Sequence, residues 1–387
     1  MPDSDSLDHL KQDIDYVKLI NQASPALQRY IRTLEMENSR LRQELMELRQ
    51  SAVRRQRAEL ARETRPDAAP TQLPTMRYPD DVMVLTVTRG GLAKRTPLND
   101  YSTQRRGGMG VFDIQSTRDD LAAHLAVTRA SASLLVLSSR GRAFRVAVDN
   151  LPLAEVRGRG ASIPERLLFT EDEAVAAVLP LDDEQDSRST VLIATQSGWL
   201  RSLHRNYVGP RLQPGTLLSD PKRGGAPAVM ALSNGASDVL LVLRSGLGYR
   251  FPERLISREG VRGIQTRPDD PVIGLVSVQS DEDEVLLVTA DGQGTRRQMA
   301  GFASNKSPGG QGKVIMKSDA VAGAARVGHG DEALCISGFA KIIRFAIDEI
   351  PAKSGNVQGV AVLDTRGDSL AALAVATPPA AAPAEEA

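Results

Sequence analysis

Short apolar runs recur along most of the chain, about 48 residues apart. Six of them have the length and the β-branched composition of strands, and they span 82–88, 134–138, 191–195, 239–243, 285–289 and 333–337. Each unit ends in a second apolar run, at 121–127, 174–181, 228–232, 272–278, 321–327 and 370–376. Two hairpins of strand in each of six units predict a closed radial array of four-stranded blades, an all-β propeller over 81–376. An open β-solenoid is the alternative, but its coils are shorter.

The same two features follow the first run of every unit. A turn comes first, with glycine in five units and Ala340 in the sixth; the glycines are Gly91, Gly141, Gly198, Gly246 and Gly292. Four residues later comes a position that is arginine in five of the six units: Arg95, Arg145, Ser202, Arg250, Arg296 and Arg344. The third unit has Arg201 beside its serine.

These recurring arginines favour a binding role over a structural one. An unpaired buried charge is costly, so a position that is arginine in nearly every unit is expected at the surface. One such residue per blade would give a basic ring around the rim, to which neighbouring cations add: Lys94, Arg142, Arg201, Arg297 and Lys341. The alternative is a set of separate surface ion pairs with nearby acids.

A basic, glycine-rich loop closes the first unit. It reads Gln104, Arg105, Arg106, Gly107, Gly108, Met109 and Gly110. Arginine offers planar, always-charged donors that fit phosphate oxygens, and glycine lets a phosphate approach the backbone N–H groups. Related stretches recur in later units, at 157–160, 222–225 and 309–313. The loops therefore predict contact with an anionic partner.

The segment before the first unit has a helical pattern. Residues 1–23 contain a short amphipathic helix, and a second helix over 24–65 begins with Ser24-Pro25 and carries a heptad register. Leucine fills every d position, and a single asparagine interrupts the apolar a positions: Leu27, Leu34, Leu41 and Leu48 at d, Ile31, Asn38 and Leu45 at a. This pattern predicts a parallel two-stranded coiled coil and hence a homodimer. A single helix packed on the rest of the protein is the alternative. Prolines in 66–80 predict a semi-rigid linker, and 377–387 is expected to be disordered.

Composition adds limits to this picture. The chain has 48 basic and 48 acidic residues, and a net charge of zero argues against a nucleic-acid binder unless the cations gather on one surface. The one cysteine, Cys335, lies in an apolar run, which indicates a buried, inert thiol. The four histidines lack metal-ligand spacing and no Gly-Lys-Thr/Ser loop is present, so we expect no metal and no other cofactor. The acidic N-terminus and the lack of a long apolar run favour a soluble cytoplasmic protein.

The six units and the loop at 104–110 resemble the C-terminal domain of DNA gyrase A, a six-bladed β-pinwheel that wraps DNA. In that family the loop reads Gln-Arg-Arg-Gly-Gly-Lys-Gly, and this chain carries Met109 in place of the lysine. Residues 88–98 are also similar to the strand–turn–strand segment before that loop. The resemblance covers about residues 80–376. It implies sequence-independent binding and wrapping of double-stranded DNA by the loop and the rim cations, with the handedness left open by Met109.

The resemblance does not extend to catalysis. DNA cleavage in the family needs a tyrosine beside an arginine on a winged-helix domain within a long N-terminal core. The two Arg-Tyr pairs here, Arg29-Tyr30 and Arg77-Tyr78, fall in the predicted coiled coil and linker, and too few residues precede the first unit for such a core. We therefore expect a nucleoid-associated protein that binds DNA without cleaving it. The alternatives are a protein–protein scaffold, favoured by the zero net charge and Met109, and a detached accessory component of a gyrase or topoisomerase core.

Overall fold

The computed structural model describes Pro25, Leu27 and residues 76–379, without 116, 118, 119, 164–166, 168, 171, 184–188, 258, 356 and 357. The chain divides into two compact units, 1–71 and 72–387, and each is described by itself. In the first unit Pro25 and Leu27 are helical and exposed. The other positions of the predicted dimer contact lie outside the described residues, so the coiled coil and the homodimer stay predictions: Ile31, Leu34, Asn38, Leu41, Leu45 and Leu48.

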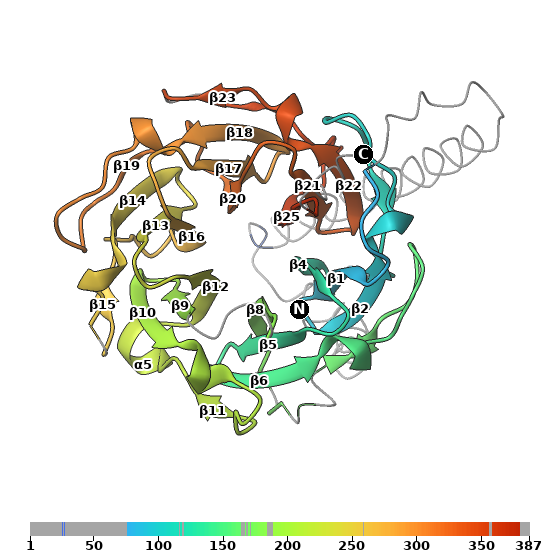
Figure 1. Ribbon diagram of the computed structural model, residues 1–387, viewed down its shortest axis with the longest axis horizontal. Coiled ribbons are helices and arrows are strands. Elements are labelled where there is room, and N and C mark those ends of the chain that lie inside the picture. The colour runs from blue at the N-terminus through green and yellow to red at the C-terminus, as the bar shows by residue number, and fades with distance from the viewer. Residues whose placement is uncertain are drawn as a thin grey trace, which may run out of the picture. The chain divides into compact units, whose positions relative to one another are not determined.

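The second unit is a ring of six sheets (Figure 1), here called blades 1 to 6, and their strands are antiparallel except that β23 (Ala352–Lys353) pairs in parallel in blade 5. From the centre outwards, blade 1 holds β4 (Ala122–Arg129), β1 (Val82–Thr88), β2 (Leu92–Pro97) and β7 (Ala161–Ser162). Blade 2 holds β8 (Val175–Leu181), β5 (Ser133–Ser138), β6 (Arg142–Ala147) and β11 (Thr216–Leu217). Blade 3 holds β12 (Pro227–Ser233), β9 (Thr190–Thr195), β10 (Trp199–His204) and β15 (Val261–Arg262).

The other three blades repeat this order. Blade 4 holds β16 (Val272–Val278), β13 (Asp238–Leu243), β14 (Leu247–Pro252) and β19 (Lys313–Val314). Blade 5 holds β20 (Val321–Val327), β17 (Glu284–Thr289), β18 (Gln293–Gln298) and β23 (Ala352–Lys353), with β24 (Val360–Ala361) also paired to β18. Blade 6 holds β25 (Leu370–Ala376), β21 (Glu332–Ser337), β22 (Lys341–Ala346) and β3 (Val111–Phe112). The predicted six-bladed, all-β fold is confirmed.

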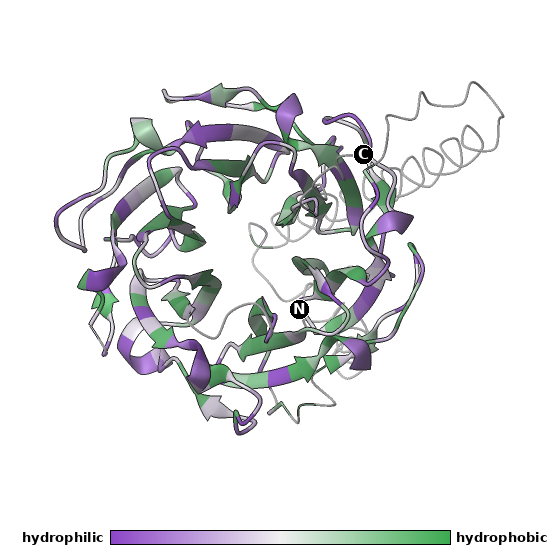
Figure 2. Ribbon diagram, viewed as in Figure 1, coloured by the Kyte–Doolittle hydropathy of each residue, from purple (hydrophilic) through white to green (hydrophobic). Residues whose placement is uncertain are grey.

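Each blade packs face to face against its neighbours, which is why its second strand is apolar on both sides (Figure 2). All six residues of β21 are buried, for example. Between blades 6 and 1, Leu334 and Ile336 of β21 pack in one cluster with Val84 of β1. Cys335 points the other way and is also buried, and burial raises the pKa of its thiol to about 12.

The turn glycines have a steric reason that the sequence pattern indicated. Gly141 has a φ of 76°, and a Cβ there would lie 1.6 Å from the carbonyl oxygen of Ser219. Only glycine accepts both that backbone conformation and that approach. In the sixth unit Ala340 adopts the same left-handed conformation at a φ of 61°.

One turn of 3-10 helix follows the strand that is third from the centre in each blade. These turns are η1 (Leu98–Asp100), η2 (Val148–Asn150), η3 (Arg205–Val208), η4 (Glu253–Leu255), η5 (Met299–Gly301) and η6 (Ile347–Glu349). The chain then crosses to the preceding blade and adds that blade's outer strand, so that β7 of the second unit pairs with β2 of the first. The ring closes in the same way, because β3 of the first unit pairs with β22 of blade 6. Among the described residues no helix is long and apolar enough to span a membrane.

We call these the crossing segments and define them from the end of each 3-10 helix to the end of the donated strand. They span 101–112, 151–162, 209–217, 256–262, 302–314 and 351–361. Figure 1 shows the strands that they donate, such as β11, β15, β19 and β23, on the outside of the ring. The crossing segments therefore form the perimeter of the propeller.

Candidate nucleic-acid interface

The recurring arginine of each unit fastens one blade to the 3-10 helix of the next unit. Arg95 on β2 donates from Nε to the carbonyl oxygen of Leu151 at 2.9 Å, and from Nη2 to that of Asp149 at 3.1 Å. Arg145 on β6 donates in the same way to the carbonyl oxygen of Val208, at 2.9 Å. These acceptors belong to or directly follow a 3-10 helix, η2 for Arg95 and η3 for Arg145. The last carbonyls of such a turn have no partner within it, so a guanidinium is a fitting cap.

In later units the arginine makes the same kind of contact and also pairs with carboxylates. Arg250 donates from Nη1 to the carbonyl oxygens of Met299 and Phe302, both at 3.2 Å, and pairs with Asp238 at 2.8 Å. Arg296 pairs with Asp348 of η6 and, on its own blade, with Glu284, both at 3.0 Å. In the third unit, Ser202 donates instead to the carboxylate of Glu253 in η4, at 3.0 Å.

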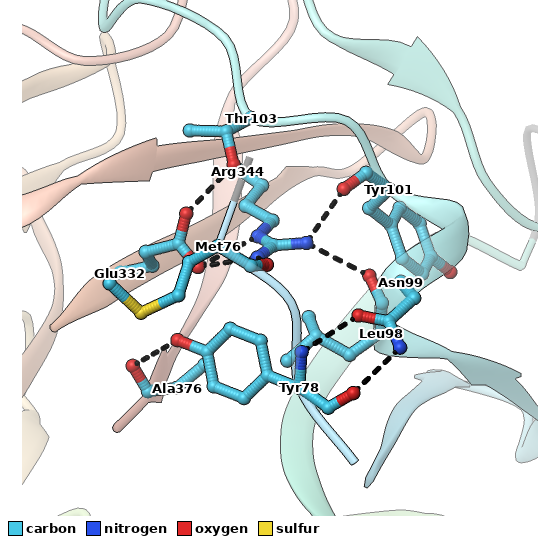
Figure 3. A network of polar contacts seen from close by, with 9 residues as sticks. All are labelled: Met76, Tyr78, Leu98, Asn99, Tyr101, Thr103, Glu332, Arg344 and Ala376. Atoms are coloured by element: carbon cyan, nitrogen blue, oxygen red, sulfur yellow. Dashed lines mark hydrogen bonds and ion pairs between the residues drawn. The ribbon is translucent and has the colours of Figure 1, made fainter. Parts of the chain in front are cut away.

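Arg344 closes the ring by joining blade 6 to the first unit (Figure 3). Its Nη1 donates to the carbonyl oxygens of Leu98 and Tyr101, at 3.1 and 2.8 Å. Its Nη2 donates to the carbonyl oxygen of Met76 at 2.8 Å and to the carboxylate of Glu332 at 2.5 Å. The residue is 1% exposed. All its donors are thus directed at protein acceptors around the junction of blade 6 with the first unit, here called the seam.

Tyr78 adds an aromatic contact to this seam. The guanidinium of Arg344 lies 5.1 Å from the centroid of the Tyr78 ring, a cation–π distance. The Tyr78 hydroxyl donates to the carbonyl oxygen of Ala376, the last residue of β25, at 3.2 Å. Burial, together with the nearby charge of Glu332, raises the pKa of Tyr78. Figure 3 shows the hydroxyl end of the Tyr78 ring directed at Ala376.

The expectation that the predicted cations all stand exposed on a rim is therefore wrong. Lys94 is 0% exposed, Arg344 1%, and Arg250 and Arg297 4% each. Burial is tolerated at three of them because carbonyl oxygens and carboxylates satisfy the donors, so the charge is not unpaired. The alternative of separate ion pairs described part of this arrangement, but several of the pairs are buried and the same arginines also bond to the 3-10 helix of the next unit.

Lys94 belongs to a fully buried polar cluster beside the loop at 104–110. Its Nζ lies 2.8 Å from a carboxylate oxygen of Asp113, with both side chains 0% exposed, and also donates to the carbonyl oxygen of Glu155 at 2.9 Å. Asp113 accepts hydrogen bonds from the hydroxyls of Tyr101 and Thr86, each at 2.5 Å. Burial and the adjacent carboxylate raise the pKa of Tyr101. The cluster anchors the end of β3 to blade 1.

The two arginines of that loop have different environments. Arg106 is held, since its Nε donates to the carbonyl oxygen of Glu349 at 3.0 Å and its Nη1 to that of Ala361 at 3.1 Å. Arg105 is exposed, and within the described residues its side chain makes no hydrogen bond or ion pair. Met109 is also exposed, at 42%.

The glycines of the loop serve its packing against the sixth unit. The Gly107 N–H donates to the carbonyl oxygen of Val362 at 2.9 Å, so it does not point at solvent. The Gly108 carbonyl accepts from the N–H of Asp364 at 2.9 Å, and the N–H of Gln104 donates to the carbonyl of Arg344 at 2.8 Å. Gly110 has a φ of 66°, and a Cβ there would lie 2.4 Å from a backbone oxygen of β22. The loop is thus a strap across the seam, with Arg105 and Met109 facing outwards.

The remaining predicted cations are partly buried. Arg142 pairs with Glu173, lies 5.1 Å from the ring centroid of Phe144, and lowers the pKa of the Glu173 carboxyl to about 2. Arg201 donates to the carbonyl oxygen of Leu218, directly after β11, at 2.9 Å. Lys341 lies 5.6 Å from the ring centroid of Phe112. These contacts leave them at the surface but already engaged.

The exposed cations lie mainly on and just beyond the crossing segments, and most were not among the residues predicted to bind. On and just beyond these segments the exposed cations are Arg105, Arg157, Arg159, Arg211, Lys222, Arg223, Arg262, Arg267, Lys306, Lys313, Lys317, Lys353 and Arg366, and the other exposed cations among the described residues are Arg77, Arg89, Arg129, Arg140, Arg244, Arg254 and Arg326. The crossing segments contain ten basic and two acidic residues, a net charge of +8 in a chain whose net charge is zero. The glycine-rich stretches at 157–160, 222–225 and 309–313 were the sequence signal for several of them. The perimeter therefore carries the segregated positive charge that a polyanion requires.

Comparison with known proteins agrees with this architecture. Four segments, 83–126, 132–161, 238–279 and 331–377, match the family described as "DNA gyrase C-terminal domain, beta-propeller". DNA gyrase A of Salmonella typhimurium is 30% identical over 295 residues, and that of Escherichia coli K12 is 28% identical over 295 residues. Each alignment covers 74% of this chain and 33% of the relative, so the chain spans about a third of the length of these relatives.

Solved structures show the same fold. A DNA gyrase A C-terminal domain superposes with a TM-score of 0.67 at 20% identity, covering 76% of this chain and all of that one. The C-terminal domain of DNA topoisomerase IV superposes with a TM-score of 0.53 at 18% identity, covering 78% of this chain and 94% of that one. Over residues 83–377 the chain belongs to the DNA gyrase C-terminal domain family of β-propellers.

Proposed function

We propose that the propeller binds double-stranded DNA along its perimeter and bends it, without reading its sequence and without cleaving it. The observation that carries this proposal is the net charge of +8 on the crossing segments of a neutral chain. Charge of one sign gathered along a convex edge attracts a phosphate backbone and favours its bending around that edge. Membership of the gyrase C-terminal family supports the same function.

The exposed side chains on and beside the crossing segments are the proposed phosphate contacts. Arg105 in the first unit, Arg157 in the second and Lys313 in the fifth illustrate their spacing around the ring. The partly exposed arginines, such as Arg95 and Arg145, lie on the strands next to the outer strands and add to the positive electrostatic potential of the perimeter. Smooth bending of a duplex costs on the order of 1–6 kcal/mol for a site of 20–30 base pairs, so several phosphate contacts must act together.

Salt dependence of duplex binding tests the perimeter directly. We expect the logarithm of the association constant to fall steeply with the logarithm of salt concentration, by about 0.9 for each phosphate neutralised. The variant Arg105→Gln/Arg157→Gln/Lys313→Gln should reduce that slope by about 2.7. A matched control, Arg129→Gln/Arg244→Gln/Arg254→Gln, removes the same charge from exposed positions outside the crossing segments and should leave the slope almost unchanged. Equal losses in both variants would refute a perimeter site.

A topological assay separates bending from simple attachment. Closed circular plasmid relaxed by a topoisomerase in the presence of the protein should retain a change in linking number after the protein is removed. A scaffold that binds only proteins would leave the linking number unchanged. Under this proposal a homodimer through 24–65 would hold two DNA segments in the nucleoid, and a separate topoisomerase core would be a partner for the chemistry.

A further inference from the structure

A cavity of about 700 Å³ opens on the perimeter where the ring closes. Its walls come from three units, with Phe112 at the end of β3, Arg157 in the second crossing segment, and Phe339 with Lys341 at the turn between β21 and β22. Arg366, in the turn before β25, completes it. The volume lies within the range of small-molecule sites and suits one or two nucleotide-sized groups.

Exposed aromatic rings set this cavity apart. Of the described aromatic side chains, Phe112, Phe339 and Tyr207 are exposed, and the first two line the cavity at 50% and 45% exposure. The ammonium of Lys341 lies 5.6 Å from the centroid of the Phe112 ring. Exposed rings cost solvation free energy in the free protein, so two in one cavity indicate a surface that becomes covered.

The charge of the cavity is positive. Arg157, Lys341 and Arg366 line it, and the acid among its lining residues is Asp368. That carboxylate already accepts backbone N–H groups, from Phe339 at 2.9 Å and from the next residue in the chain at 2.7 Å. Arg366 also pairs with an aspartate two residues before it, at 3.1 Å and exposed to solvent, where the pair is weak. The cavity therefore complements an anion.

Backbone strain is concentrated at the same place. Four described residues other than glycine have a positive φ, and three of them belong to this cavity or its rim: Arg157 at 72°, Ala340 at 61° and Arg366 at 48°. Ala340 lies between the two lining residues Phe339 and Lys341. Such conformations cost free energy and often mark sites where side chains are held in a particular direction.

We propose that this cavity binds unpaired bases of single-stranded DNA. Aromatic faces stack on any base, and the neighbouring cations bind the phosphates that join the bases. An acidic peptide would satisfy the charge, but the apolar part of the lining is two aromatic rings and Ile114, a surface for flat rings rather than a pocket of aliphatic side chains. The side chains of Gln115, Thr117 and Thr365 instead match the hydrogen-bonding edges of bases. The site shares Arg157 with the proposed duplex surface, but its two rings take unpaired bases, which a duplex does not offer.

Anisotropy of a labelled oligothymidylate of about 15 nucleotides tests the site on the full chain. We expect Phe112→Ala/Phe339→Ala to weaken single-strand binding by about fivefold or more, the effect of losing a base–aromatic stack. Both side chains are exposed, so the fold should persist, and circular dichroism checks it. The matched control is Leu217→Ala, which removes an equally exposed apolar side chain from the second position of β11, as Phe112 is the second residue of β3.

The outcomes discriminate among the possibilities. Loss of oligothymidylate binding in the double variant, with the control and the duplex affinity within about twofold of wild type, supports the site. Undetectable oligothymidylate binding by wild type, or equal binding by the double variant, overturns it. Binding of a Phe- and Glu-containing peptide that the double variant loses while oligothymidylate binding stays would assign the cavity to a protein instead. Because duplex affinity is measured separately, failure of the perimeter proposal is distinguishable from failure of this one.

Discussion

Replacing Arg344 with methionine tests whether the recurring arginine closes the ring. The guanidinium is 1% exposed and joins β22 to the carbonyl oxygens of Leu98, Tyr101 and Met76 and to the carboxylate of Glu332. Methionine keeps most of the volume but removes every donor. Glu332 would then be left buried with the hydroxyl of Thr103 as its remaining partner in Figure 3, at 2.8 Å.

The expected cost follows from what is left behind. Breaking a buried ion pair from one side costs about 3–5 kcal/mol, because an uncompensated charge stays in the interior. The carbonyl oxygens that lose a donor add to this, though such terms are not additive. The same recurring position in blade 5 is the control: Arg296 is 14% exposed and its acids, Glu284 and Asp348, are 20% and 38% exposed. Arg296→Met should therefore cost about 1 kcal/mol.

Urea unfolding of the full chain, followed by the fluorescence of its single tryptophan, Trp199, measures both costs. Hydrogen exchange locates them. With Arg344→Met, the amides of Tyr101 and Gln104 at the seam should exchange faster, whereas amides of β9 and β10 in blade 3 should change little. The double variant Arg344→Met/Glu332→Met should be less destabilised than the sum of the single changes, because no buried charge is left alone.

Equal free-energy losses for Arg344→Met and Arg296→Met would refute the reasoning. So would exchange that rises uniformly around the ring, since the seam would then be no weaker than the other junctions. If Arg344→Met is as stable as wild type but no longer binds duplex DNA, then Arg344 contacts DNA and does not close the ring, and the inference from its burial is wrong.

Three further predictions concern stability. Arg297→Leu should raise the melting temperature and increase the free energy of unfolding by about 1–3 kcal/mol. The reason is that Nε and Nη1 of this buried arginine have no hydrogen-bond partner and that desolvation lowers its pKa. The corresponding residues of the other units carry no charge: Thr96, Val146, Leu203, Phe251 and Phe345. Gly141→Ala should prevent normal closure of its turn and lower the melting temperature markedly, whereas Gly355→Ala, with open space around it, should not. Glu173→Gln should remove an acid-sensitive contribution: pairing with Arg142 lowers the pKa of Glu173 to about 2, so this stability is present above pH about 4.5 and is lost as pH falls toward 2. Wild type should thus lose more stability than the variant across that range in pH-dependent urea titrations.

The blades could be predicted because their signals are local. Apolar strands and turn glycines recur at a fixed spacing, and a glycine such as Gly141 has a φ of 76° in the tight turn between two consecutive strands. The outer strands could not be found in this way. A two-residue strand such as β3 has no pattern of its own, and its partner β22 lies more than two hundred residues away in the sequence.

The role of the arginines was harder to predict for a different reason. A cation once per unit looks the same in the sequence whether it faces a phosphate or the 3-10 helix of the next unit. The third unit held a usable clue. Its position carries Ser202, and the next 3-10 helix begins with Glu253, where most other units have an apolar residue; the two side chains are hydrogen-bonded at 3.0 Å. A compensating pair of this kind indicates contact between neighbouring units.

Arg105 and Arg106 show how one short motif divides two tasks. Arg106 points inwards and caps the backbone of the sixth unit, so its charge holds the strap against η6 and β24. Arg105 points outwards with no protein partner among the described residues, so its charge is available to a polyanion. The same division applies to the whole ring: inward arginines hold neighbouring blades together, and the cations of the crossing segments give the perimeter its field. Under the proposed function, arginine recurs in nearly every unit, yet the affinity for DNA would depend on the cations of the less regular crossing segments.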